Sequence, residues 1–145
     1  MRRAFVRRMI AKRFEDLVCW QLARELERQV YAFTAVPPAA NDLEYCRQIR
    51  ESSSSSPRNM AEGFGRYLPG DFAKFMRNAL GSLNETRDHL GAGYEQGYLS
   101  EQRYEELKGL TNRAIGASVR LTDYLERSKK TWRGRTRRRT KHVEP

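Results

Sequence analysis

The chain has 145 residues, of which 39% are hydrophobic and 32% are charged, and its formal net charge is +10. This length suits a single domain that can bury a core. No apolar run reaches the roughly 18 residues that a membrane span needs, and the basic N-terminus lacks the apolar core of a signal peptide. These features exclude a membrane partner and predict a cytoplasmic protein.

The basic residues are concentrated at the two ends of the sequence. Residues 1–13 hold six of the 28 basic residues and no acid, residues 129–145 hold eight with a single acid, and residues 14–128 have a small excess of acids. A charge run is usually a solvated segment, but runs of this density attract polyanions. The chain therefore divides into a basic N-terminal arm (1–13), a helical domain (14–128) and a basic C-terminal tail (129–145). Because the tail is highly charged, it is predicted to be disordered when free.

The first helix is expected from Phe14 to Phe33, and Val36-Pro37-Pro38 ends it with a stiff turn. Its apolar stripe consists of Val18, Leu22, Leu26, Val30 and Phe33. Trp20 and Tyr31 lie off this stripe. They are candidates for a contact between subunits, with side-on packing inside one chain as the alternative.

The second helix is expected to start at a capping box of Asn41 and Glu44 and to end before Pro69-Gly70. It contains five consecutive serines, Ser52–Ser56, followed by Pro57. Helical spacing nevertheless continues straight through this run, at Leu43, Cys46, Ile49, Ser53, Met60, Phe64 and Tyr67. This spacing favours one helix, kinked at Pro57, in which serines allow close approach of a neighbouring helix and bond back to carbonyls one turn earlier. A flexible linker is the alternative.

Two more helices follow. Asp71 is the predicted N-cap of the third, whose stripe is Phe72, Phe75, Met76, Ala79, Leu80, Leu83 and Leu90. Ser100 is the predicted N-cap of the fourth, which is expected to fray near Ser128 and whose stripe is Tyr104, Leu107, Leu110, Ala114, Ala117, Leu121 and Tyr124. No strand alternation is present. The sequence therefore predicts an all-α protein, an antiparallel up-down-up-down four-helix bundle.

The pattern Ser-x-Pro-x-Asn-x-Ala-Glu-Gly occurs at Ser55 to Gly63 and is followed by Gly65 and Arg66. It resembles the four helix bundle protein family, also called the 23S rRNA intervening-sequence protein family. Further matches across 14–125 are Phe14-Glu15-Asp16-Leu17 with Trp20 and Ala23, Gln48-Ile49-Arg50, Asp71-Phe72 with Phe75, Gly81-Ser82 with Glu85, and Gly97-Tyr98. The chain departs from the family pattern at Ser56, where an isoleucine is usual, and at Met60, where another aliphatic residue is usual.

The resemblance implies a ring-forming subunit, a homopentamer, and no catalytic activity. Members of the family are encoded in intervening sequences of bacterial 23S rRNA genes. Distant relatives are accessory subunits of the reverse transcriptases of diversity-generating retroelements; they are basic and bind nucleic acid and the polymerase.

A structural role is assigned to five residues of the motif: Pro57, Asn59, Glu62, Gly63 and Arg66. Arg58 and Arg66 stand one turn on either side of Glu62, so Glu62 can pair with both on a helix. Surface pairs of this kind contribute only about 0.3–0.5 kcal/mol each. Two interpretations stand: a solvated triad, or a role for Glu62 and Asn59 in fixing a helix bend or a subunit contact.

No group of residues predicts catalysis, a metal site or a cofactor. His89 and His142 have no cysteine or histidine at ligand spacing, and no Gly-rich loop follows a strand. Arg137 and His142 fit a loose spacing found in some ribonucleases, which a low-complexity basic tail produces by chance. We therefore expect a non-enzyme.

The leading hypothesis is that the basic ends bind RNA or DNA phosphates without reading sequence. The predicted binding residues are Lys129, Lys130, Trp132, Arg133, Arg135, Arg137, Arg138, Arg139 and Lys141 in the tail, and Arg2, Arg3, Arg7 and Arg8 in the arm. Trp132 either stacks on an exposed base or is an ordinary tail aromatic. The competing hypothesis is a protein-interaction module whose partner is a reverse transcriptase or another acidic protein.

Overall fold

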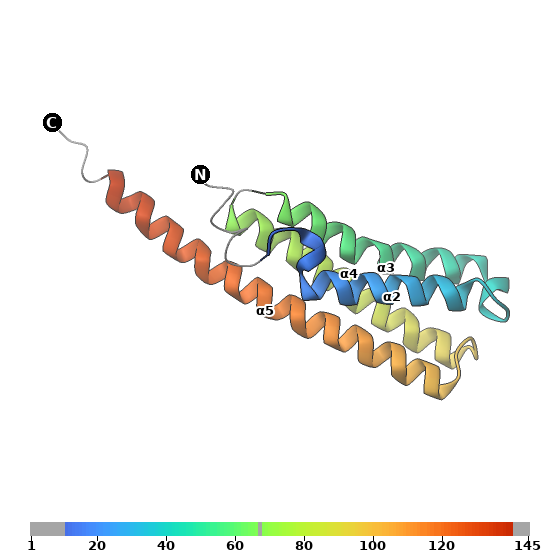
Figure 1. Cartoon of the computed structure of the whole chain (residues 1–145). Coiled ribbons are helices and arrows are strands. Elements are labelled where there is room, and N and C mark those ends of the chain that lie inside the picture. Colours follow the sequence, from blue (N-terminus) through green and yellow to red (C-terminus); the bar gives the residue numbers. More distant parts are fainter. Residues whose placement is uncertain (1–10, 67, 141–145) are drawn as a thin grey trace.

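The computed structural model describes the backbone of residues 11–66 and 68–140 and the side chains up to residue 129. Four α-helices, α2 (Val18–Thr34), α3 (Leu43–Phe64), α4 (Pro69–Glu95) and α5 (Glu101–Thr140), are accompanied by two short 3-10 turns, η1 (Phe14–Asp16) and η2 (Ala39–Asn41). Each α-helix lies beside the next, and α2 also lies beside α5, which closes the bundle (Figure 1). The described residues contain no strand. The predicted all-α, up-down-up-down four-helix bundle is confirmed.

All four helices contribute to one core, whose largest fully buried side chains include Leu26, Ile49, Met60, Phe72, Met76, Leu83, Leu90, Leu107 and Leu125. Two residues assigned to the apolar stripes are instead exposed: Val18 is 60% exposed and Leu43 is 79% exposed. Each is the first residue of its helix. In the first half of α2 the small residues Cys19 and Ala23 face the core, one position after the predicted Val18 and Leu22, whereas the predicted Leu26, Val30 and Phe33 are buried.

The helix starts differ from the sequence prediction at three places. The first helix, expected from Phe14, begins at Val18, and Phe14–Asp16 form the separate turn η1. Asp42, not Asn41, is the N-cap of α3, and its Oδ1 accepts a hydrogen bond from the Tyr45 N–H at 3.1 Å. Helix α4 starts at Pro69 rather than after Asp71, because proline suits the first helical position, where its missing N–H needs no partner. The prediction for α5 is confirmed, since the Arg103 N–H donates to Ser100 Oγ at 3.1 Å.

Helix α3 runs without interruption through the serine run and Pro57, so the continuous helix is confirmed and the linker is excluded. The hydroxyls of Ser52, Ser53 and Ser56 each donate to the carbonyl three residues earlier. Pro57 has no N–H to offer the Ser53 carbonyl. The buried Ser56 hydroxyl, 3.2 Å from that carbonyl, replaces the missing donor.

Helix α5 is longer than predicted. It continues to Thr140, and its C-terminal end projects beyond the other helices (Figure 1). The prediction of a helix end near Ser128 and of a disordered tail is therefore wrong for residues 129–140. These residues contain no proline and are rich in arginine and lysine, which favour helix and interact favourably with the negative end of the helix dipole. Residues 141–145 and residues 1–10 of the arm lie outside the described residues.

Candidate nucleic-acid interface

The basic C-terminal segment is carried by a helix, although few of its side chains are described. The backbone of residues 130–140 belongs to α5. Lys129 is half-buried, and its side chain crosses Gly70 at the start of α4, where its Cδ would lie 3.3 Å from an added Cβ. Lys141 and the four arginines of the arm (Arg2, Arg3, Arg7 and Arg8) lie outside the described residues.

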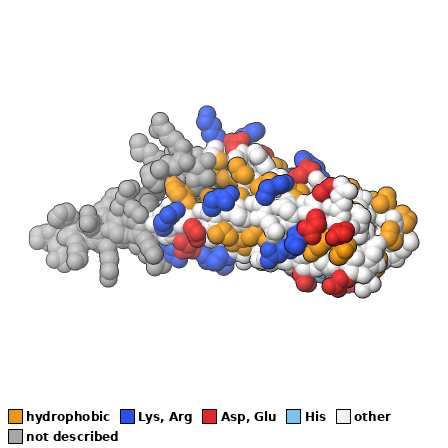
Figure 2. Space-filling view, turned by 90° about the horizontal axis from the view of Figure 1, so that it is seen from below, with side chains coloured by type: hydrophobic (Ala, Val, Ile, Leu, Met, Phe, Trp, Pro, Cys, Tyr) orange, Lys and Arg blue, Asp and Glu red, His pale blue; other side chains and the backbone are white. Residues whose placement is uncertain are grey.

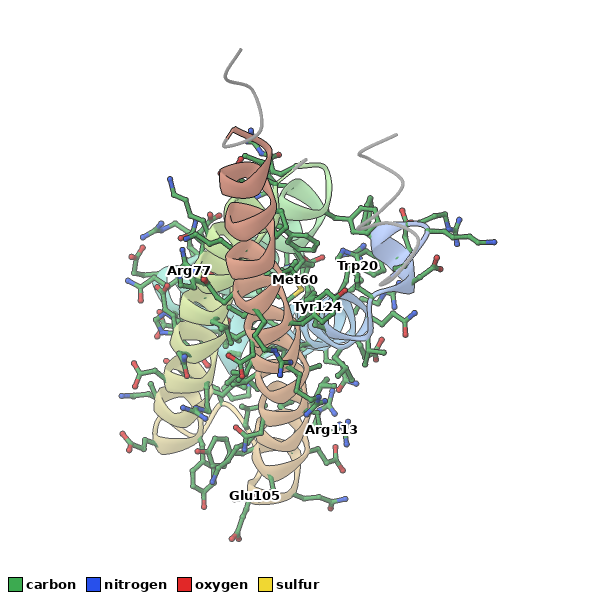
Figure 3. All side chains as sticks on the ribbon, turned by 90° about the vertical axis from the view of Figure 1, so that its left-hand side faces the viewer. Trp20, Met60, Arg77, Glu105, Arg113 and Tyr124 are labelled. Atoms are coloured by element: carbon green, nitrogen blue, oxygen red, sulfur yellow. The ribbon has the colours of Figure 1, made fainter. Side chains whose placement is uncertain are left out.

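A line of arginines on the bundle leads to this segment. Arg113, Arg120 and Arg127 are exposed on α5 and are spaced by seven residues, so they share one side of the helix at intervals of about 10 Å. Figure 3 labels Arg113 on this helix. The Arg120 guanidinium lies back along α5, with Nη1 3.4 Å from the position that a Cβ of Gly116 would occupy. Sequence analysis did not identify this line, although the seven-residue spacing was its signal.

Two members of this line differ from most arginines of the bundle in their partners. Arg47, Arg58 and Arg103 each pair with a glutamate of their own helix, and Arg66, just beyond the end of α3, pairs with Glu62. Among the described residues, neither Arg113 nor Arg120 forms an ion pair with a carboxylate. Both guanidinium groups are therefore available to an external anion.

Charge changes sign along α5. Its first turns contain Glu101, Glu105 and Glu106, whereas residues 127–141 contain nine basic residues and no acid. Figure 2 views the molecule from the side of α5 and shows several Asp and Glu side chains gathered near the end where α5 begins. This distribution places positive potential at one end of the molecule, where it can attract a polyanion.

The motif of α3 lies at the contact with α4. A Cβ on Gly63 would lie 2.7 Å from Phe75 Cβ and 3.0 Å from Phe72 Cδ1, so only glycine allows the two helices to approach this closely. Pro57 is buried in the same helix. The Arg66 guanidinium lies 4.8 Å from the centre of the Phe75 ring, which adds a second contact with α4.

The polar residues of the motif form hydrogen bonds within α3 and with Arg66 just beyond its end. Glu62 accepts a hydrogen bond from Arg66 at 2.7 Å, but Arg58 pairs with Glu51 at 3.2 Å, so the expected triad is a single pair. Asn59 Nδ2 donates to the Ser55 carbonyl at 2.8 Å.

Both aromatic residues expected off the core stripe of α2 have contacts within the chain. The half-buried Trp20 packs edge-on against Phe14, with ring centres 5.3 Å apart. Tyr31 is 44% exposed, and the Arg50 guanidinium lies 4.7 Å from the centre of its ring.

The described residues contain no group of three or more histidine, cysteine or acidic side chains that could hold a metal ion. Within the same part of the chain, every helix is too short or too polar to cross a membrane. Both cysteines are buried free thiols, and burial raises the pKa of Cys19 to about 11.

A sequence model of the 23S rRNA-intervening sequence protein family matches residues 15–117. The match covers α2, α3 and α4 and the first part of α5, including the motif from Ser55 to Gly63. It ends before Arg120 and before the basic segment. No curated protein matches the chain. With most of its bundle matched, the chain belongs to the 23S rRNA-intervening sequence protein family.

Proposed function

We propose that this family member is a non-enzymatic nucleic-acid-binding protein, in which the bundle is the scaffold and the basic end of α5 contacts RNA or DNA. One observation carries the proposal: residues 127–141 hold nine basic residues without an acid, and residues up to 140 continue a helix out of the bundle. The helical domain has a small excess of acids, so attraction for polyanions is concentrated at this end.

Binding of this kind uses phosphate groups. Lysine and arginine displace counterions condensed on the nucleic acid, which makes affinity fall steeply with salt and gives no sequence readout. Arg113 and Arg120 extend the positive path back along the bundle. Trp132 is the one aromatic residue of the segment, and it supplies a surface on which an unpaired base can stack.

The proposal includes self-association as a homopentamer. Its support is the family membership, together with apolar side chains on the surface, among them Val18, Leu43 and Val119. Several basic helices in one assembly would raise the avidity for a long polyanion above that of a single helix. Light scattering at micromolar protein in moderate salt is expected to give a multiple of the 17.0 kDa chain mass, and a monomer would contradict this part of the proposal.

The binding proposal is tested by deleting residues 129–145 and measuring the fluorescence anisotropy of labelled 20-nucleotide RNA and DNA. All described buried residues lie between Leu17 and Leu125, so the truncated bundle is expected to keep its fold, which circular dichroism checks. We expect at least a tenfold loss of affinity near 0.1 M salt.

Equal binding by the truncated chain would contradict the assignment of the interface to α5. Failure of the full chain to bind either nucleic acid would contradict the proposed function itself. It would favour the alternative, a protein-interaction subunit such as an accessory protein of a diversity-generating reverse transcriptase.

A further inference from the structure

The helical backbone of the basic segment gives its charges a fixed register. The buried positions Ser118, Thr122 and Leu125 mark the side of α5 that faces the bundle, and the half-buried Lys129 follows them. Continued at steps of three and four, this stripe reaches Trp132, Thr136 and Thr140. The stripe is therefore uncharged beyond the bundle, where no other described helix accompanies α5 (Figure 1).

The basic residues flank this uncharged stripe on both sides. By helical register, Arg133 and Arg137 lie next to it on one side, and Arg135 and Arg139 lie next to it on the other. A disordered tail would not hold these residues in fixed rows. A helix with a narrow uncharged stripe between two rows of arginine matches a groove whose floor consists of bases and whose two walls are phosphates.

We propose that the end of α5 binds the major groove of duplex DNA. An α-helix with its side chains is about 10–12 Å across, and the major groove of B-form DNA is about 12 Å wide. In A-form RNA the major groove is deep and narrow and does not admit a helix. Rows of arginine on both sides of an uncharged stripe suit the phosphates of the two DNA strands, and the stripe itself suits the base edges between them. This inference rests on the proposed nucleic-acid binding and adds the class of nucleic acid.

Gly134 allows the helix to be tested without changing a charge. It lies inside the segment, where proline would remove a backbone hydrogen bond and break the helix, whereas alanine would favour the helix. Full-length Gly134→Pro and Gly134→Ala are compared with the unmodified chain by anisotropy with three labelled probes: a 20-base-pair DNA duplex, an RNA duplex of the same sequence, and its single strand. Circular dichroism reports the helix content of each variant.

We expect the unmodified chain and Gly134→Ala to bind the DNA duplex at least fivefold more tightly than the RNA duplex. Gly134→Pro is expected to lose this preference while retaining salt-dependent binding to all three probes. The RNA duplex is the decisive comparison, because a flexible basic tail also prefers a duplex to a single strand on charge density alone.

Equal affinity of the unmodified chain for both duplexes would overturn the inference, as would a preference for DNA that survives Gly134→Pro with reduced helix content. These outcomes are distinct from failure of the proposed function, in which the full chain binds none of the three probes.

Discussion

Helices α3 and α4 pack closely at Gly63 because this residue has no Cβ atom. Replacing Gly63 with alanine would place a methyl group 2.7 Å from Phe75 Cβ, an atom that cannot move without its helix. We expect the free energy of unfolding to fall by about 1–3 kcal/mol, as for other overpacked sites. Gly81→Ala is the matched control, because a Cβ there meets nothing within 4 Å and alanine favours helix. Urea unfolding of both variants should show a loss only for the first; equal stability would contradict the close approach.

The Ser56 hydroxyl compensates for the backbone N–H that Pro57 lacks, and this can be tested by substitution. It donates to the Ser53 carbonyl, which Pro57 leaves without its usual N–H partner. Ser56→Ala is expected to destabilise the fold by about 1–3 kcal/mol, since a buried carbonyl would lose its donor. The same substitution in a Pro57→Ala background should cost less, because residue 57 then supplies an N–H. A double-mutant cycle by urea unfolding measures the difference, and a coupling energy of zero would exclude this compensation.

Cys19 links stability to pH. Burial raises the pKa of its thiol from 9.0 to about 11, so above pH 9 the unfolded chain loses this proton before the folded protein does. The contribution of the protonated Cys19 thiol to the stability of the fold is fully present below about pH 9 and is lost as the pH rises towards 11. We expect the stability difference between the unmodified protein and Cys19→Ala to shrink over this range. A difference that is constant from pH 8 to pH 10.5 would show that the thiol ionises equally in both states.

Within helix α4, the position of each leucine around the helix axis determines whether it is fully buried or half-buried. The sequence assigned Leu80 and Leu83 to one apolar stripe, but Leu83 is fully buried and Leu80 is half-buried. Leu83→Ala is expected to cost about 2–5 kcal/mol. Leu80→Ala should cost clearly less, because part of that side chain already contacts water. Thermal unfolding of the two variants gives the order, and a reversed order would mean that another face of α4 packs into the core.

The elements themselves could be predicted because each of the four helices repeats its apolar residues at steps of three and four. The helix starts were harder, since Asn41 and Asp42 are both good N-caps and adjacent in sequence. The carboxylate of Asp42, the N-cap, also accepts a hydrogen bond from the distant Tyr98 hydroxyl, which no local pattern records. The serine run was read correctly because its neighbours keep the same period on both sides of Pro57.

The end of α5 could not be predicted from apolar spacing, which stops at Leu125. Arginine and lysine favour a helix without producing an apolar stripe, so this part of the candidate interface had only a charge signal. Buried polar residues were missed for a related reason. Thr86 and Ser118 are fully buried because their hydroxyls donate to carbonyls one turn earlier, and a hydrophobicity pattern does not record that bond.

For the whole molecule, the family-matched bundle and the proposed binding end are largely separate. The match ends at residue 117, whereas the nine basic residues without an acid lie in 127–141. The bundle pairs most of its described arginines with its own acidic residues, and the backbone of α5 carries the basic segment outward. Loss of residues 129–145 should therefore weaken binding strongly without removing the fold.

The salt dependence of RNA binding tests this account most directly. The full chain and the chain ending at residue 128 are titrated with a single-stranded 20-nucleotide RNA between about 50 and 300 mM salt. If one α5 end contacts about six phosphates, the slope of log affinity against log salt is roughly −4, from about −0.7 per contact. We predict this slope or a steeper one for the full chain, and a much flatter slope with weaker binding for the truncated chain. The same slope and the same affinity for both proteins would contradict the account and would assign binding to another surface.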